Sequence, residues 1–98
     1  MAVYIIKFSA PLGSDHPKGR AQYYVGYTRM SIRNRLKVHR AGYGAAITRA
    51  AVQKGLTLNI VWTSSKGSRQ LEREIKSWKS VRGWLRAHPQ RANRAHKY

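Results

Sequence analysis

Apolar runs separated by turn-forming residues occupy the first part of the chain. Residues 2–8 (AVYIIKF) are rich in β-branched and aromatic side chains, which is typical of a strand. A second such run covers residues 21–27, and residues 9–20 between them hold the prolines and glycines of a loop. The pattern predicts two strands that form a wide antiparallel hairpin.

Helical spacing replaces this pattern after the second strand. Apolar residues four positions apart predict a helix over residues 32–40, and Ser31 is a suitable N-cap for it. Two glycines then separate this helix from a short alanine-rich helix over residues 45–54. Gly55 lies where a glycine commonly ends a helix.

A third strand and a long helix are predicted in the last part of the chain. Residues 56–63 alternate between apolar and polar side chains, and residues 68–88 have helical spacing. The apolar face of this helix consists of Leu71, Ile75, Trp78 and Leu85. We therefore expect an α+β fold: a small three-stranded mixed or antiparallel sheet flanked by helices, in the order β-β-α-α-β-α. Residues 1–88 would form one domain and residues 89–98 a basic tail.

The charge balance of the chain indicates the class of its partner. The 98 residues include 20 Lys and Arg against 3 Asp and Glu, a net charge of +17, which indicates a polyanionic partner such as nucleic acid. The basic residues run from Lys7 to Lys97 instead of lying on one amphipathic helix, so membrane binding is disfavoured. There are no cysteines, no apolar stretch of about 20 residues and no secretion signal, so we expect a cytoplasmic protein.

Several kinds of chemistry find no support in the sequence. No glycine-rich phosphate loop is present, the four histidines lack metal-ligand spacing, and no serine or cysteine triad can be identified. We expect no small-molecule cofactor. The residue types that remain are tyrosines on two neighbouring strands, an Arg and a His one helical turn apart, and two acidic residues on the last helix. Cleavage of a phosphodiester needs a base, a cation and usually a metal held by carboxylate, and these types supply all three.

Short motifs in a fixed order resemble the GIY-YIG nuclease superfamily. They are Val3-Tyr4-Ile5, Tyr24-Val25-Gly26, Arg35-Leu36 with His39, residues 42–49 (GYGAAITR), and Leu71-Glu72 continuing through residues 72–78 (EREIKSW). The resemblance covers roughly residues 3–85 and is strongest to small stand-alone bacterial members. The order of the motifs matches the order of the predicted elements. Val3 stands where the family name has Gly.

The resemblance implies roles for the residues of the first three motifs. Tyr4 and Tyr24 would flank the scissile phosphate, and one of them would take the proton of the attacking water directly or through a neighbour. Arg35 would neutralise charge on the phosphate, and His39 would assist proton transfer or contact the phosphate. Gly26 would allow a close approach of the backbone.

The resemblance also implies a metal ion. Glu72 would be its single protein ligand, and the ion would be Mg²⁺ or Mn²⁺ with water and phosphate oxygens in its other positions. DNA would be held by basic side chains on the helices: Arg33, Lys37, Arg40, Arg49 and Lys76. The predicted function is a metal-dependent endonuclease that hydrolyses DNA. The alternatives are a catalytically inactive nucleic-acid-binding module on the same scaffold and a basic RNA- or ribosome-associated protein.

Some assignments stay open at this point. On a helical wheel Glu74 lies nearer the apolar face than Glu72, so geometry alone does not select Glu72. The stretch between Tyr24 and Arg35 is one residue longer than usual in the family, which makes Arg33 the alternative. Some family members use an Asn after the last helix, and here Asn93 lies in the predicted tail. The loop over residues 9–20 is longer than in minimal members and could influence substrate choice.

Aromatic residues have a structural alternative to each functional role. Any one tyrosine on these strands could simply pack on the sheet. We expect Trp62 and Trp78 to belong to the core. Trp84 could be a core residue or a platform for an unpaired base, and we favour the core.

Overall fold

The computed structural model describes residues 1–66 and 68–88. In these ranges it has three strands and four helices: β1 (Ala2–Phe8), β2 (Tyr23–Thr28), α1 (Ile32–Arg40), α2 (Ala46–Gln53), β3 (Leu58–Ser64), α3 (Arg69–Ser77) and α4 (Val81–Ala87). The predicted basic tail, which includes Asn93, lies outside the described residues. None of the described helices is long and apolar enough to cross a membrane.

The three strands form one antiparallel sheet in the order β2-β1-β3. The predicted α+β class and the antiparallel hairpin of the first two strands are confirmed. In the register between β1 and β2, Tyr4 lies opposite Gly26. The pairing of β1 with β3 shifts by one residue between Ile5 and Ile6.

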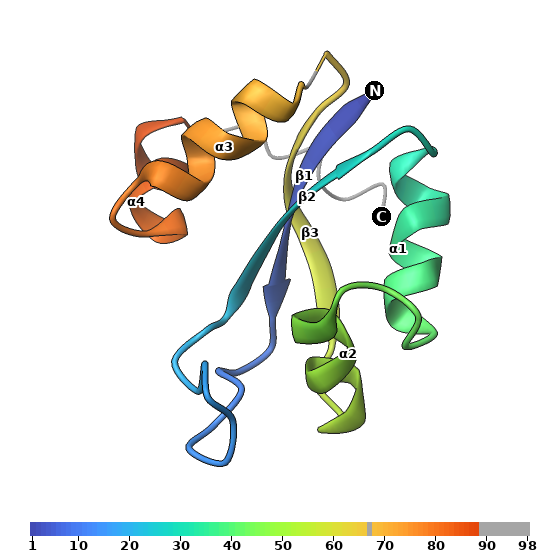
Figure 1. Cartoon of the computed structure of the whole chain (residues 1–98), viewed down its shortest axis with the longest axis vertical. Coiled ribbons are helices and arrows are strands. Elements are labelled where there is room, and N and C mark those ends of the chain that lie inside the picture. The colour runs from blue at the N-terminus through green and yellow to red at the C-terminus, as the bar shows by residue number, and fades with distance from the viewer. Residues whose placement is uncertain (67, 89–98) are drawn as a thin grey trace.

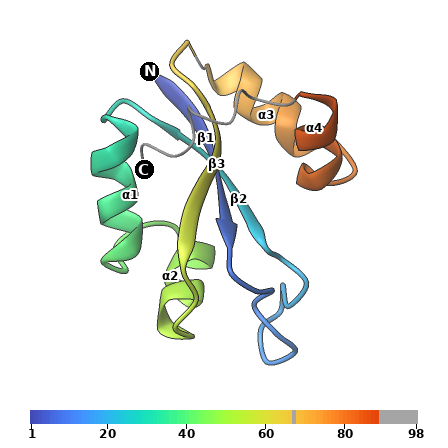
Figure 2. The same ribbon diagram turned by 180° about the vertical axis from the view of Figure 1, so that it is seen from behind.

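The central strand β1 is covered on both faces. In Figures 1 and 2, α1 and α2 lie on one side of the sheet and α3 and α4 on the other. Successive side chains of a strand point to opposite faces, so Tyr4 and Ile6 enter the core under α1 and α2, whereas Val3 and Ile5 enter the core under α3 and α4. This two-sided burial explains why residues 2–8 are apolar almost without interruption.

The ends of α1 and α2 agree with the signals in the sequence. The hydroxyl of Ser31 accepts a hydrogen bond from the backbone N–H of Asn34 at 3.1 Å, which satisfies one free donor of the first turn. Gly55 follows the C-cap of α2 with a φ of +77°, a backbone conformation in which L residues are strained.

The predicted single helix over residues 68–88 is wrong, because the chain breaks it into α3 and α4. Trp78 and Ser80 have extended backbone, with ψ of 153° and 150°. The Ser80 hydroxyl accepts from the backbone N–H of Gly83 at 3.0 Å, so it caps a new helix. The turn lets Trp84 fold back onto the sheet, where its ring meets Trp62 edge to face at 6.0 Å.

The break also decides which tryptophans are buried. Trp62 and Trp84 are buried, as expected, but Trp78 is 41% exposed, so its predicted place in the core is wrong. Its ring instead lies edge-on against the rings of Trp84 and His88 at the surface. Trp78 would face the core only if the helix continued through it.

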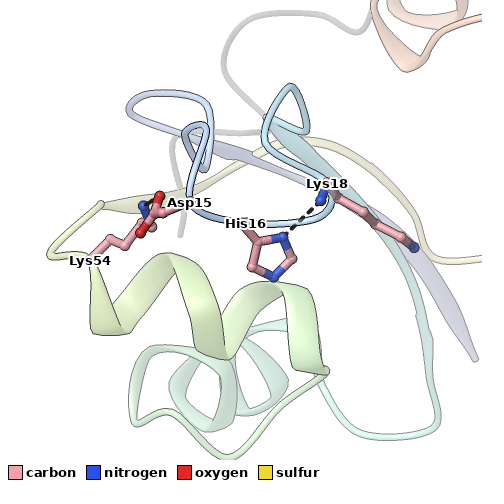
Figure 3. Close-up of polar contacts among 4 residues, drawn as sticks. All are labelled: Asp15, His16, Lys18 and Lys54. Carbon is pink, nitrogen blue, oxygen red and sulfur yellow. Dashed lines mark hydrogen bonds and ion pairs between the residues drawn. The ribbon is translucent and has the colours of Figure 1, made fainter.

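The long loop between β1 and β2 is tied to the end of α2. Figure 3 shows the ion pair between Asp15 and Lys54 that joins them. Within the loop, Ala21 donates its N–H to Lys18 O at 2.9 Å, so β2 begins at Tyr23 and not at residue 21. Likewise Leu56 N–H donates to Ala51 O at 3.0 Å, and β3 begins at Leu58 instead of residue 56.

Candidate active site

Tyr4 is the buried centre of a polar cluster on the sheet face under α1 and α2. Its side chain crosses over Gly26, its partner on β2, and a Cβ atom at Gly26 would overlap the phenol ring and hydroxyl. The ring can therefore lie flat along the sheet only because residue 26 has no side chain. Tyr4 is only 1% exposed.

Tyr24 lies beside it on the edge strand β2. It is two residues before Gly26, so its side chain points to the same face as Tyr4. The two ring centroids are 6.2 Å apart with an interplanar angle of 50°. Tyr24 is half-buried. Of the two phenols, it is the one that solvent can reach.

His39 closes the cluster from the last turn of α1. Its ring meets Tyr24 edge to face at 5.1 Å, and its Nε2 atom is 2.7 Å from the Tyr4 hydroxyl. On the other side of the ring, Nδ1 is 2.8 Å from the hydroxyl of Thr48 on α2. His39 is completely buried, and Gly44 lies against it so closely that a Cβ there would overlap the ring.

Arg35 lies one turn before His39 on the same face of α1. Its guanidinium interacts with both phenols and with His39. Arg33, the alternative in the sequence, is exposed on the helix surface. The structure thus brings Arg35 to the cluster.

Burial controls the protonation of these groups. Burial raises the pKa of Tyr4 to about 12 and raises the pKa of Tyr24, and Arg35 partly offsets both effects. The pKa of His39 is lowered to about 4, first by burial and then by the charge of Arg35. At neutral pH both phenols therefore keep their protons and His39 is uncharged.

Glu72 approaches the cluster from the opposite side of the sheet, in the first turn of α3. Its side chain is 15% exposed and lies 3.4 Å from the ammonium of Lys76. Its carboxylate is close enough to Tyr24 to contribute to raising the pKa of that phenol. Glu74 is exposed. Of the three acidic side chains, Glu72 is thus the one whose charge acts on Tyr24, whereas Asp15 pairs with Lys54 in the loop between β1 and β2.

The helical wheel that favours Glu74 includes Trp78, which lies outside α3. Without Trp78, the apolar face of α3 consists of Leu71 and Ile75, and both carboxylates lie about 80° from its centre on an ideal wheel. The wheel then no longer favours Glu74.

The five basic residues predicted to contact nucleic acid have different surroundings. Arg33, Lys37 and Arg49 are exposed on α1 and α2. The guanidinium of Arg40 donates to Leu58 O at 2.8 and 3.2 Å, so it also ties α1 to β3. Lys76 is half exposed and pairs with Glu72. Contact with nucleic acid stays a prediction for all of them.

Thr48 and Gly44 are the contacts of this cluster that the sequence did not reveal. Both lie in the stretch GYGAAITR, whose resemblance to the family implies no role for either residue. Thr48 is a fully buried polar residue three positions before the buried Ala51, so both face the core from α2. A threonine at such an apolar position is the signal that could have identified it, because a buried hydroxyl needs a partner.

The cluster suits a hard divalent cation with one protein ligand. No group of three or more His, Asp or Glu side chains within residues 1–66 and 68–88 could hold a metal by itself. Glu72 offers carboxylate oxygens at a partly shielded position, and Mg²⁺ commonly takes one or two carboxylates and completes its shell with water and phosphate oxygens. The donors present fit such an ion if the substrate supplies the remainder.

Comparison with known families agrees with this arrangement. The family model described as the GIY-YIG catalytic domain matches residues 1–84, which include every residue of the cluster. No curated protein and no solved structure gave a match to the chain.

Proposed function

The chain belongs to the family of GIY-YIG catalytic domains, a nuclease superfamily whose members generally use divalent metal ions, and from this premise we propose that it is an endonuclease that hydrolyses DNA phosphodiester bonds. One observation carries the proposal: the two phenols, a guanidinium and an imidazole lie together, and the charge of the Glu72 carboxylate acts on Tyr24.

Hydrolysis sets requirements that these side chains can meet. A water oxygen bonds to phosphorus, the bond from phosphorus to one deoxyribose oxygen breaks, and the proton lost by water must be accepted while the leaving oxygen gains one. Arg35 would bind a phosphate oxygen and offset the negative charge that grows there. Tyr24, the half-buried phenol, would meet the attacking water, whereas Tyr4 is too deeply buried for that role.

Glu72 would hold the divalent cation. When bound, such an ion stabilises charge on the phosphate and makes a water molecule more acidic. The partial burial of the carboxylate and the effect of its charge on Tyr24 support this role. Lys76, which pairs with Glu72, lies where it could exchange that carboxylate for a phosphate.

The positive charge supports a nucleic-acid substrate. A net charge of +17 attracts the phosphate backbone without selecting a base sequence. An inactive binding module would have the same positive charge. It would gain nothing from a carboxylate close to phosphate, because the two negative groups repel each other.

Arg35→Ala tests the proposal. Its matched control is Lys37→Ala, which removes an exposed charge from the same helix. We expect the wild type to nick or cut supercoiled plasmid with Mg²⁺ or Mn²⁺ and not with EDTA. Arg35→Ala should lower kcat by about 100-fold or more. Lys37→Ala should raise KM and leave kcat within about twofold, because a backbone contact positions the substrate without acting in the reaction.

Two results would contradict this function. If no DNA form is cut with either ion while DNA binding persists, the binding module is the correct assignment. If Lys37→Ala lowers kcat as much as Arg35→Ala does, Arg35 has no particular role in the reaction. A panel of single-stranded, duplex, flap and four-way DNA then identifies the preferred substrate.

A further inference from the structure

A chain of hydrogen bonds continues beyond His39 to the backbone of α2. Nδ1 of His39 is 2.8 Å from the Thr48 hydroxyl, and that hydroxyl donates to the backbone oxygen of Ala45 at 2.9 Å. Nε2 on the opposite side of the ring faces the Tyr4 hydroxyl at 2.7 Å. All three side chains are buried, so water does not compete for these bonds.

The position of each hydrogen follows from what the partners can donate. The Thr48 hydroxyl has one hydrogen, and Ala45 O can only accept, so this hydrogen lies between the two oxygens. If the hydroxyl turned toward His39, two oxygens would face each other at 2.9 Å with no hydrogen between them. Nδ1 must therefore donate to Thr48.

The other ring nitrogen, Nε2, is then unprotonated. His39 is uncharged at neutral pH, because burial and Arg35 lower its pKa to about 4. A neutral imidazole with a hydrogen on Nδ1 has none on Nε2, so Tyr4 donates its phenolic hydrogen to Nε2. Four groups from four elements surround the ring: Tyr4 from β1, Tyr24 from β2, Arg35 from α1 and Thr48 from α2.

We propose that Thr48 is a positioning residue that holds His39 in the tautomer protonated on Nδ1, so that Nε2 is kept as the proton acceptor for Tyr4. The inference rests on the proposed nuclease function for its consequence, but the tautomer itself does not depend on it. Thr48 would then act through His39 and not by contact with DNA.

The consequence is a route for the proton of the attacking water. A neutral phenol can accept a proton only if it gives up its own. Water would pass a proton to Tyr24, Tyr24 to Tyr4, and Tyr4 to Nε2 of His39, so that both phenols end as neutral as they began. The leaving oxygen then takes a proton from solvent, and the imidazolium returns its own proton to solvent by the same route, so that the reaction consumes one water in total. With the opposite tautomer, Nε2 carries a hydrogen and the route is closed.

The first test measures the tautomer in the protein alone, without DNA or metal. Nitrogen-15 NMR of the His39 ring distinguishes a protonated nitrogen from a bare one. We expect Nδ1 to be protonated and Nε2 bare in the wild type and in Thr48→Ser. In Thr48→Val, which keeps the shape but removes the acceptor, the population protonated on Nε2 should rise. A wild type protonated on Nε2 overturns the proposal, and so does an unchanged ring in Thr48→Val.

The second test measures cleavage under the conditions in which the wild type cuts DNA. Thr48→Val should lower kcat by at least about 10-fold with little change in KM, because the bound geometry is kept while proton transfer is impaired. Thr48→Ser should restore most of kcat. Thr57→Val makes the same exchange at an exposed residue outside the cluster and should behave as the wild type.

The two tests separate failure of this inference from failure of the proposed function. A wild type that cuts no DNA refutes the nuclease assignment and leaves the NMR result standing. A Thr48→Val variant that cuts like the wild type refutes the relay and leaves the nuclease assignment standing. The wild-type NMR measurement needs no variant, so it decides the tautomer even if Thr48→Val fails to fold.

Discussion

Among the glycines that the structure describes, Gly26 and Gly44 lie directly against the rings of the cluster. At Gly26 a Cβ would overlap the Tyr4 phenol, and at Gly44 it would overlap the His39 imidazole. Each glycine therefore fixes where one ring can lie. Because proton transfer between the rings depends on distances of hydrogen-bond length, these two residues control the geometry of the rings without supplying a side chain.

Gly44→Ala and Gly42→Ala separate this effect from ordinary backbone strain. Gly42 has open space around it but a φ of +85°, so alanine there costs about 1–2 kcal/mol of stability through strain and should leave cleavage intact. Alanine at Gly44 pushes the His39 ring away, and cleavage should fall by at least about 10-fold. Urea unfolding and kcat measure the two effects. Equal losses of kcat in both variants would show that Gly44 has no special contact.

The sequence indicates some of these residue positions and not others. The spacing of four places Arg35 and His39 on one helix face, and two tyrosines on paired strands were expected to meet. The close backbone approach expected at Gly26 is found against Tyr4. Thr48 and Gly44 were not expected, because their contact with His39 depends on how the loop between α1 and α2 folds. Short-range patterns carry no information on such a contact.

At the scale of elements, the junction of α3 and α4 decides how the second core forms. The turn at Trp78 to Ser80 directs Trp84 onto Trp62 and leaves His88 O to accept from the Trp62 indole N–H at 3.1 Å. The His88 ring also stacks on Trp84 with centroids 3.6 Å apart. The short α4 is thus held by aromatic contacts more than by its own length.

Ser80→Ala tests whether two helices exist here. If Ser80 caps α4, the variant should lose about 1 kcal/mol of unfolding free energy, because the N–H of Gly83 loses its acceptor. If residues 68–88 formed one helix, alanine in its middle would instead stabilise the protein, by about 0.5 kcal/mol. Ser65→Ala, at an exposed turn position, is the control. Urea denaturation gives the sign, and a stabilised Ser80→Ala would contradict the break.

The elements themselves were largely predictable, and their junctions less so. Periodicity identified all three strands and the first two helices within about two residues. It failed at Trp78, because the apolar spacing of Leu71, Ile75, Trp78 and Leu85 continues through the turn even though the backbone does not. Side-chain periodicity shows which residues could share one face of a helix. The serine that caps a new helix in the same stretch is a weaker signal than this periodicity.

At the scale of the molecule, the excess of positive charge makes each of the few carboxylates informative about function. With 20 basic and 3 acidic side chains, an acid near the DNA surface opposes binding unless it has another task. Asp15 stabilises a loop through Lys54. Glu72 pairs with Lys76 and its charge acts on Tyr24, and a divalent cation held by this carboxylate would offset its repulsion of phosphate.

Glu72→Gln and Glu74→Gln together decide whether cleavage needs the carboxylate at position 72, because the two residues lie on one helix and each exchange removes one negative charge. With Mg²⁺ and saturating DNA, Glu72→Gln should lose cleavage by at least about 100-fold while it binds DNA as well as the wild type or more tightly. Glu74→Gln should cut like the wild type. If Glu72→Gln cuts normally and Glu74→Gln does not, the Glu72 carboxylate is not the metal ligand and this account of the site is wrong.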